Sequence, residues 1–104
     1  MNTRLSRSPE KPIGVFYEHP EWFNPMFDEL DRRSIPYEKL LATQHTFDPE
    51  EESSPYSLIL NRMSPSAFTR GNSHAIFYTL QYLSHLKNIR ANVLNGYDAY
   101  VNEF

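Results

Sequence analysis

The sequence contains no cysteine and only three glycines among its 104 residues. The absence of cysteine excludes disulfides, thiolate metal ligands and a cysteine nucleophile. Gly14 and Gly71 stand in no phosphate-binding glycine pattern, and three glycines are too few for the loop that cradles a nucleotide phosphate. The chain is therefore expected to hold no cofactor, and any nucleotide would bind elsewhere.

Long apolar runs are also absent. No segment approaches the ~20 residues of a membrane helix, and residues 1–11 lack the apolar region of a signal peptide. We expect a cytoplasmic protein without membrane contact, with residues 1–11 as a disordered polar leader of net charge +2. Since the whole chain carries −3, the other 93 residues carry −5. An acidic body without a Lys/Arg stripe repels a phosphate backbone, which argues against nucleic-acid binding.

Apolar residues make up 39% of the chain and aromatic residues 14%, enough for one folded domain over residues 12–104. Short apolar runs alternate with segments of helical periodicity. The expected strands are 13–17, 37–42, 56–60 and 91–94, and the expected helices are 25–33, 72–87 and one beginning at Tyr97. No stop signal follows in this last helix, so we expect the domain to be truncated within it.

This element order predicts an α/β fold with a small parallel four-stranded Rossmann-like sheet and helices on both faces. A right-handed crossover places the second strand beside the first. The polar connection 43–55, which lacks a core-forming pattern, can then carry the chain to the other side of the first strand. The expected strand order is 2-1-3-4, with ligands favouring the carboxyl edge at the switch point between strands one and three.

Several local expectations concern polar residues. Asn24 is expected to cap the first helix, followed by Pro25 in its first turn. Asn72 or Ser73 is expected to cap the second helix and Asn95 the third. The four histidines show no metal-binding spacing, so surface or loop positions are the default for them. His19 differs, because it follows the first strand at the carboxyl edge.

The segment 61–71 is the strongest candidate for binding. It follows the third strand, contains Arg62 and Arg70 in an acidic protein, and leads to a helix N-terminus. Arginine offers planar, multi-donor recognition of a carboxylate or phosphate, and a helix N-terminus adds backbone donors. A structural ion pair of either arginine with a neighbouring carboxylate is an equally good interpretation.

Two motifs carry a family resemblance: Asn-Arg-Met-Ser-Pro-Ser-Ala at 61–67, followed by Arg70-Gly71, and Val-Leu-Asn-Gly-Tyr-Asp-Ala at 93–99, followed by Glu103. They resemble the N-terminal, pre-ATP-grasp domain of ATP-grasp ligases, in the branch of ribosomal-protein glutamate ligases and glutathione-synthetase-like enzymes. The resemblance covers roughly residues 12–104 in element order. The chain departs from the family pattern at Ser34, where glycine is usual, and at Tyr56-Ser57, where an aspartate is common.

The resemblance implies a ligase that activates a carboxylate as an acyl phosphate and joins it to an amine or thiol. ATP and Mg would bind to the remaining ATP-grasp domains, so this chain alone would be inactive and hold no metal. It would contribute to the site for a small-molecule or peptide acceptor, and a homo-oligomer is compatible with the family. The residues that match its motifs are Asn61, Arg62, Ser64, Arg70 and Asn95, to which position alone adds His19. No catalytic residue is expected.

A stand-alone flavodoxin-like or receiver-like module is the main alternative, since it shares the 2-1-3 strand order. A receiver requires acidic residues after its first strand and an aspartate ending its third, where this chain has Glu18-His19 and Asn61-Arg62. A flavodoxin requires a Ser/Thr/Gly phosphate loop, in place of which stands His-Pro-Glu-Trp at 19–22. A partner-binding module without a ligand is a third interpretation.

Overall fold

The computed structural model describes residues 11–19, 21–64 and 71–102. The expected leader therefore lies outside the described residues except for Lys11, whose Nζ donates to the Ser54 carbonyl at 3.0 Å. The elements in chain order are β1 (Ile13–Tyr17), α1 (Asn24–Arg32), β2 (Tyr37–Leu41), β3 (Leu58–Asn61), α2 (Ser73–Asn88), β4 (Val93–Leu94) and α3 (Tyr97–Val101). Among the described helices, none has the length and apolar character needed to cross a bilayer.

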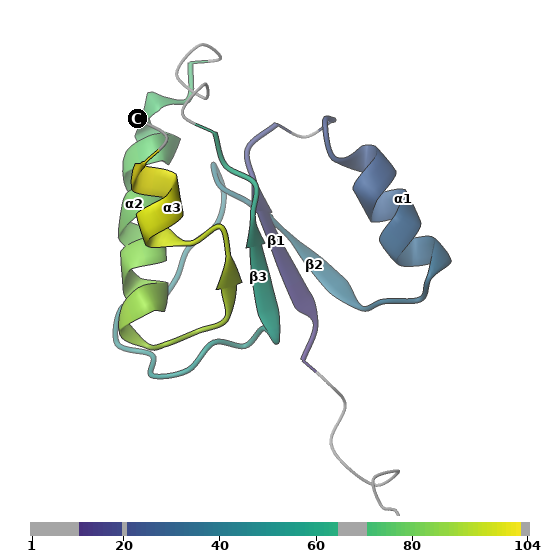
Figure 1. Cartoon of the computed structure of the whole chain (residues 1–104). Coiled ribbons are helices and arrows are strands. Elements are labelled where there is room, and N and C mark those ends of the chain that lie inside the picture. The colour runs from purple at the N-terminus through teal and green to yellow at the C-terminus, as the bar shows by residue number, and fades with distance from the viewer. Residues whose placement is uncertain (1–10, 20, 65–70, 103–104) are drawn as a thin grey trace, which may run out of the picture.

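The sheet is parallel throughout with the order β2-β1-β3-β4, which confirms the predicted fold class and topology. Ile13 at the start of β1 pairs with Tyr37 of β2 on one side and with Leu58 of β3 on the other. Figure 1 shows α1 on one side of the sheet, and α2 with α3 on the other. Helices thus cover both faces, as right-handed crossovers in a parallel sheet require.

The larger core lies between the sheet and α2. Phe16 and Ile59, from the two central strands, are fully buried there. The other buried members of this cluster are Leu40, Ala42, Met63, Ala75, Ile76, Tyr82, Leu83, Leu86 and Tyr100. The chain crosses to this side through residues 43–55, and Phe47 of that segment packs against the cluster.

The segment 43–55 is a loop, as expected, and although its sequence has no core-forming pattern it adds aromatic side chains to the core. The His45 ring lies 4.6 Å from the Tyr82 ring, and His45 Nδ1 is 2.7 Å from the Tyr78 hydroxyl. Phe47 stacks on His85, whose Nε2 is 3.4 Å from Glu51 Oε1. The default of a surface or loop position holds for His45, which lies in this loop and is partly buried, but is wrong for His85, which is buried in α2. Their burial depends on contacts between residues more than 30 positions apart, which no local pattern encodes.

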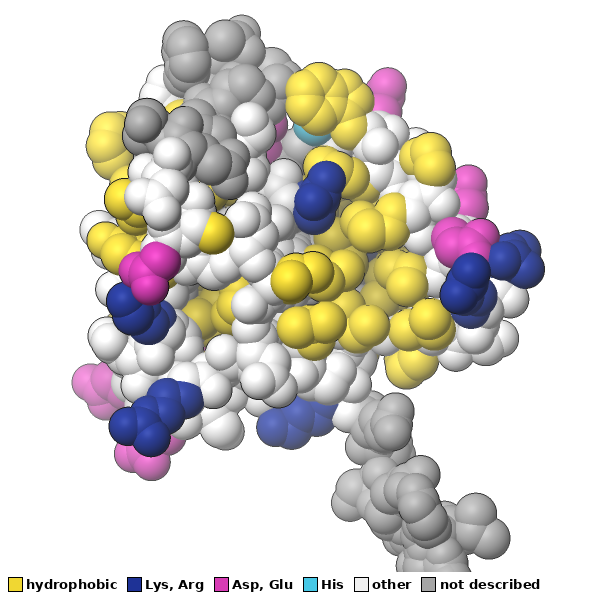
Figure 2. All heavy atoms as spheres, viewed as in Figure 1, with side chains coloured by type: hydrophobic (Ala, Val, Ile, Leu, Met, Phe, Trp, Pro, Cys, Tyr) yellow, Lys and Arg dark blue, Asp and Glu magenta, His cyan; other side chains and the backbone are white. Residues whose placement is uncertain are grey.

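The other side of the sheet has a smaller core, formed by the buried side chains of Val15, Tyr17 and Phe27. The single helix α1 supplies its cover, and Leu94 at the far edge of the sheet remains 63% exposed. Figure 2 shows hydrophobic side chains gathered on the surface between the sheet and α1. The two faces of the sheet are thus unequally covered.

The asparagines expected as helix caps have other roles. α1 begins at Asn24 itself, with Phe23 at the N-cap position. Asn72 is the N-cap residue of α2, but its side chain donates to Glu18 Oε2 at 2.6 Å rather than to the helix. Gly96, not Asn95, is the N-cap residue of α3. In each case a tertiary partner or a shift of one residue replaced the local capping bond.

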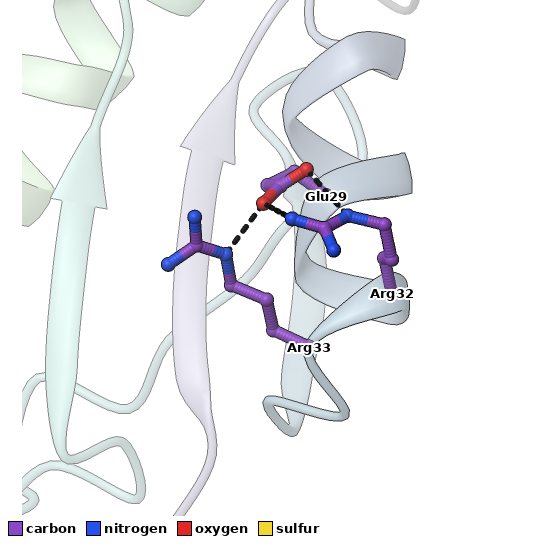
Figure 3. Close-up of polar contacts among 3 residues, drawn as sticks. All are labelled: Glu29, Arg32 and Arg33. Carbon is purple, nitrogen blue, oxygen red and sulfur yellow. Dashed lines mark hydrogen bonds and ion pairs between the residues drawn. The ribbon is translucent and has the colours of Figure 1, made fainter.

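The end of α1 is stabilised by charge. Glu29 accepts hydrogen bonds from both Arg32 and Arg33, as Figure 3 shows, and these bonds lower the pKa of the Glu29 carboxyl. The two arginines also lie at the negative end of the helix dipole. Ser34 follows with φ of 56°, the left-handed conformation in which glycine is usual.

Candidate functional site

The carboxyl ends of β3 and β4 are joined by two asparagine side chains. Asn61 Nδ2 donates to the Asn95 carbonyl at 2.9 Å, and Asn95 Nδ2 donates to the Asn61 carbonyl at 3.4 Å. Asn61 Oδ1 also accepts the Met63 backbone N–H at 3.1 Å. With 1% exposure Asn61 is a buried polar residue that depends on these bonds. Asn95 has φ of 65°, a conformation that asparagine tolerates better than most residues.

Arg62 extends from the same strand end to the opposite side of the sheet, because successive side chains of a strand alternate. Its guanidinium carbon lies 5.5 Å from the centre of the Phe23 ring, in a cation–π arrangement. Its backbone N–H donates to the Phe16 carbonyl at 2.7 Å, which fixes the main chain at this point. Among the described residues no carboxylate forms an ion pair with Arg62, so the structural-pair interpretation finds no partner there.

The stacked aromatic rings of Trp22 and His19 lie near Arg62. The Trp22 ring stacks on the His19 ring with 4.1 Å between centroids and 10° between planes. His19 Nδ1 accepts the backbone N–H groups of Glu21 and Trp22, each at 3.3 Å, which orients the imidazole. Trp22 is nevertheless 57% exposed. The only tryptophan of the chain is therefore held at the surface by a backbone-anchored histidine.

These groups surround a hollow of about 320 Å³ at the carboxyl edge. Its walls are Trp22, Phe23, Asn61, Arg62, Met63, Ser64 and Asn95. Four of the predicted site residues, Asn61, Arg62, Ser64 and Asn95, thus lie together. Arg70 lies outside the described residues. Trp22 and Phe23 were missed as site residues, because apolar residues near a helix start are usually core; the isolated tryptophan just after a strand was the available signal.

His19 lines a different hollow, on the other side of the β1 end. This second hollow, of about 520 Å³, is bordered by Glu18, His19, Glu21, Leu41, Thr43, Asn72 and His74. Glu18 is 6% exposed and accepts the hydrogen bond of Asn72 described above. Within the described ranges no three His, Asp or Glu side chains are grouped to hold a metal ion. His19 therefore supports Trp22 from behind rather than facing the Arg62 hollow.

The hollow beside Arg62 combines one cation, amide groups and an aromatic wall. Arginine recognises carboxylates and phosphates through its planar set of donors, and aromatic rings supply apolar contact area. The arrangement suits a small anion with an apolar or planar portion. No protein-family model matches the chain, and neither a curated protein nor a solved structure is significantly similar to it.

Proposed function

We propose that this chain is the substrate-side domain of an ATP-dependent carboxylate–amine (or thiol) ligase that acts through an acyl phosphate. The proposal is supported by one observation: residues of the two motifs that resemble ATP-grasp ligases, 61–64 and 93–97, meet at the Arg62 hollow through the Asn61–Asn95 hydrogen bonds. Asn61 and Asn95 are 34 positions apart in the sequence, and the parallel pairing of β3 and β4 brings them to the same edge of the sheet.

In this proposal Arg62 binds a carboxylate of the acceptor. A charged hydrogen bond to such a group contributes about 1.5–3 kcal/mol. The Asn61 and Asn95 side chains hold the two strand ends in register, so they are positioning residues for the hollow. Trp22 contacts the apolar part of the acceptor, and Ser64 supplies a hydroxyl at its rim. Arg70 belongs to the proposed site through the resemblance alone.

ATP and Mg would be supplied by the remaining ATP-grasp domains of the ligase, which are the proposed partners of this chain. Because it has no glycine-rich phosphate loop, the chain itself is expected to bind no ATP at micromolar concentration. A ligase that consumes ATP also fits the cytoplasm as its location. A small molecule or a peptide would be the acceptor.

The test is a titration followed by NMR. The ¹⁵N-labelled chain is titrated separately with glutamate, with short peptides ending in a free carboxylate, and with MgATP. The expected result is saturable shifts of the Arg62, Ser64 and Asn95 amides with a carboxylate ligand only. Arg62→Ala should abolish these shifts, whereas the control Arg90→Ala, an exposed arginine in the turn between α2 and β4, should keep them.

Two results would contradict the proposal. Micromolar MgATP binding by the chain would place the nucleotide site here and indicate a stand-alone nucleotide-binding module. Carboxylate binding that survives Arg62→Ala would remove Arg62 from the acceptor site. In the protein expressed from its complete reading frame, acceptor-dependent ADP release should fall with Arg62→Ala while the melting temperature of the chain stays nearly unchanged.

A further inference from the structure

The outward face of α2 carries no charged side chain over four turns. The residues of this face are Ser73, Phe77, Leu80, Gln81, Ser84 and Asn88. They recur at intervals of three and four, the spacing of a helix seam that faces another helix. Helix faces in contact with water are normally rich in charge, and 22% of this chain is charged. The composition of the face is that of a contact surface.

This face has one projection and one hollow. Phe77 is 67% exposed, the highest value among the large apolar side chains of the described residues. Beyond it along α2 lies a hollow of about 470 Å³ with Leu80, Gln81 and Ser84 in its floor. Phe47 and Pro49 of the 43–55 loop form one wall, and Tyr97 of α3 forms the other. Phe77 lies two helical turns, about 10 Å, from Ser84 near the middle of this hollow.

We infer that the outward face of α2 is a self-association surface, occupied by the same face of a second copy running antiparallel. A two-fold contact brings residue i of one copy against residue j of the other, and j against i. When the axis passes between Leu80 and Gln81, each Phe77 lies opposite Ser84 of the other copy. Each projection then enters the hollow of the other copy, so the surface is complementary to itself.

Charge also favours a second copy as the occupant. The chain has a net charge of −3, so two copies repel each other at most surfaces. Contact through the outward face of α2 places no carboxylate against another along the seam. This inference is independent of the proposed function.

The first test is sedimentation velocity of the 104-residue chain from low to high micromolar concentration. A monomer–dimer equilibrium is expected, and it should persist in about 0.5 M NaCl because no opposite charges hold the seam together. Phe77→Glu should raise the dissociation constant at least about tenfold, as loss of a central aromatic anchor does. Gln81→Lys, which places like charges beside the axis, should act in the same direction.

The matched control is Leu94→Glu, since Leu94 is similarly exposed at 63% but lies on the opposite side of the sheet. It should leave the dimer intact. A chain that is monomeric at all concentrations, or a dimer dissociated by Leu94→Glu and not by Phe77→Glu, would overturn the inference. Circular dichroism of each variant confirms folding, and the exposure of both residues makes unfolding an unexpected result.

Cysteine cross-linking tests the antiparallel geometry. The chain has no cysteine, so each single-cysteine variant reports one position only. Gln81→Cys lies beside the proposed axis and should form an intermolecular disulfide under mild oxidation. Asp31→Cys on α1 should not. Cross-linking at both positions to the same extent, or at neither in a solution that sediments as dimer, would refute the antiparallel α2 contact.

Discussion

The two sides of the sheet differ in cover and in chemistry. On the α2 side two helices and the 43–55 loop enclose Phe16 and Ile59 completely. On the α1 side one helix covers the β1–β2 half, and the opposite half ends in the exposed Leu94. Arg62 and the Phe23 ring lie on this less covered side. The difference indicates that the α2 side supplies most of the stability. The less covered surface of the α1 side, with Arg62 and Phe23, is available to bind a ligand.

The largest expected effect compares one phenylalanine from each side. Phe16→Ala should cost about 4 kcal/mol of unfolding free energy, because its fully buried ring contacts Tyr78, Tyr82 and His45. Phe27→Ala should cost about 3 kcal/mol or less, since its thinner surroundings can relax toward solvent. Urea unfolding measures both. An equal or reversed order would break the comparison, and Phe16→Leu preserves the test if the alanine variant does not fold.

A smaller effect is expected from the buried asparagine at the edge. Asn61→Ala removes two hydrogen bonds, leaving the Asn95 carbonyl and the Met63 N–H without this partner, and should cost about 2–3 kcal/mol. The control Asn24→Ala changes an exposed residue whose side chain makes no capping bond, and should stay within about 0.5 kcal/mol. Equal losses of unfolding free energy in the two variants would show that the Asn61 side-chain hydrogen bonds do not stabilise the fold.

The tight packing on the α2 side can be tested by adding a single methyl group. An added Cβ at Gly14 would lie 2.9 Å from Leu40 Cδ1 and 3.1 Å from the Tyr56 ring. Gly14→Ala is therefore expected to cost about 1–2 kcal/mol through overpacking. At Gly96 the nearest atoms would lie at 3.7 Å, an ordinary contact, so Gly96→Ala should change stability little. If Gly14→Ala had the same unfolding free energy as the original chain, this core would be less closely packed than the structure indicates.

The smallest expected effect is a pH dependence confined to the α2 side. Burial lowers the pKa of His45 below its ordinary 6.5, an effect that attraction to Glu51 partly offsets. The unfolded chain therefore binds the proton more readily, and stability is lost as the pH falls below about 6.5 toward the folded pKa. Burial raises the pKa of Tyr78 to about 12, so its hydroxyl stays neutral throughout.

His45→Phe should weaken the pH dependence of the unfolding free energy below about pH 6.5. The matched change His74→Phe, at an exposed position of α2, should leave the pH dependence as it is in the original chain. Urea unfolding at several pH values measures both variants. If the unfolding free energy of His45→Phe still fell with decreasing pH to the same extent, the pH dependence would arise from other groups.

Much of the fold could be predicted because the strands are short apolar runs separated by helical periodicity. Topology followed from two further facts, the right-handed crossover rule and the long 43–55 connection. The limits of the third strand differ from those expected, because β3 begins at Leu58 rather than at Tyr56. Tyr56 lies before the strand, and its hydroxyl donates to Glu38 Oε1 at 3.1 Å. Asn61, Arg62, Ser64 and Asn95 could be predicted as neighbours because parallel strands end at one edge. Trp22 and Phe23 could not, since apolar character alone does not distinguish core from surface.

The sequence by itself determined the α/β class, the strand order and the edge at which Arg62 lies, because these depend on local periodicity and on the handedness of connections. Only the tertiary structure decided the partners of polar side chains. Asn72 turned from its helix to Glu18, Asn95 joined Asn61, and His45 entered the aromatic core. The physical reason is that a buried polar group bonds to whichever partner the packed chain brings within reach. That partner is commonly distant in sequence, so local pattern carries no information about it.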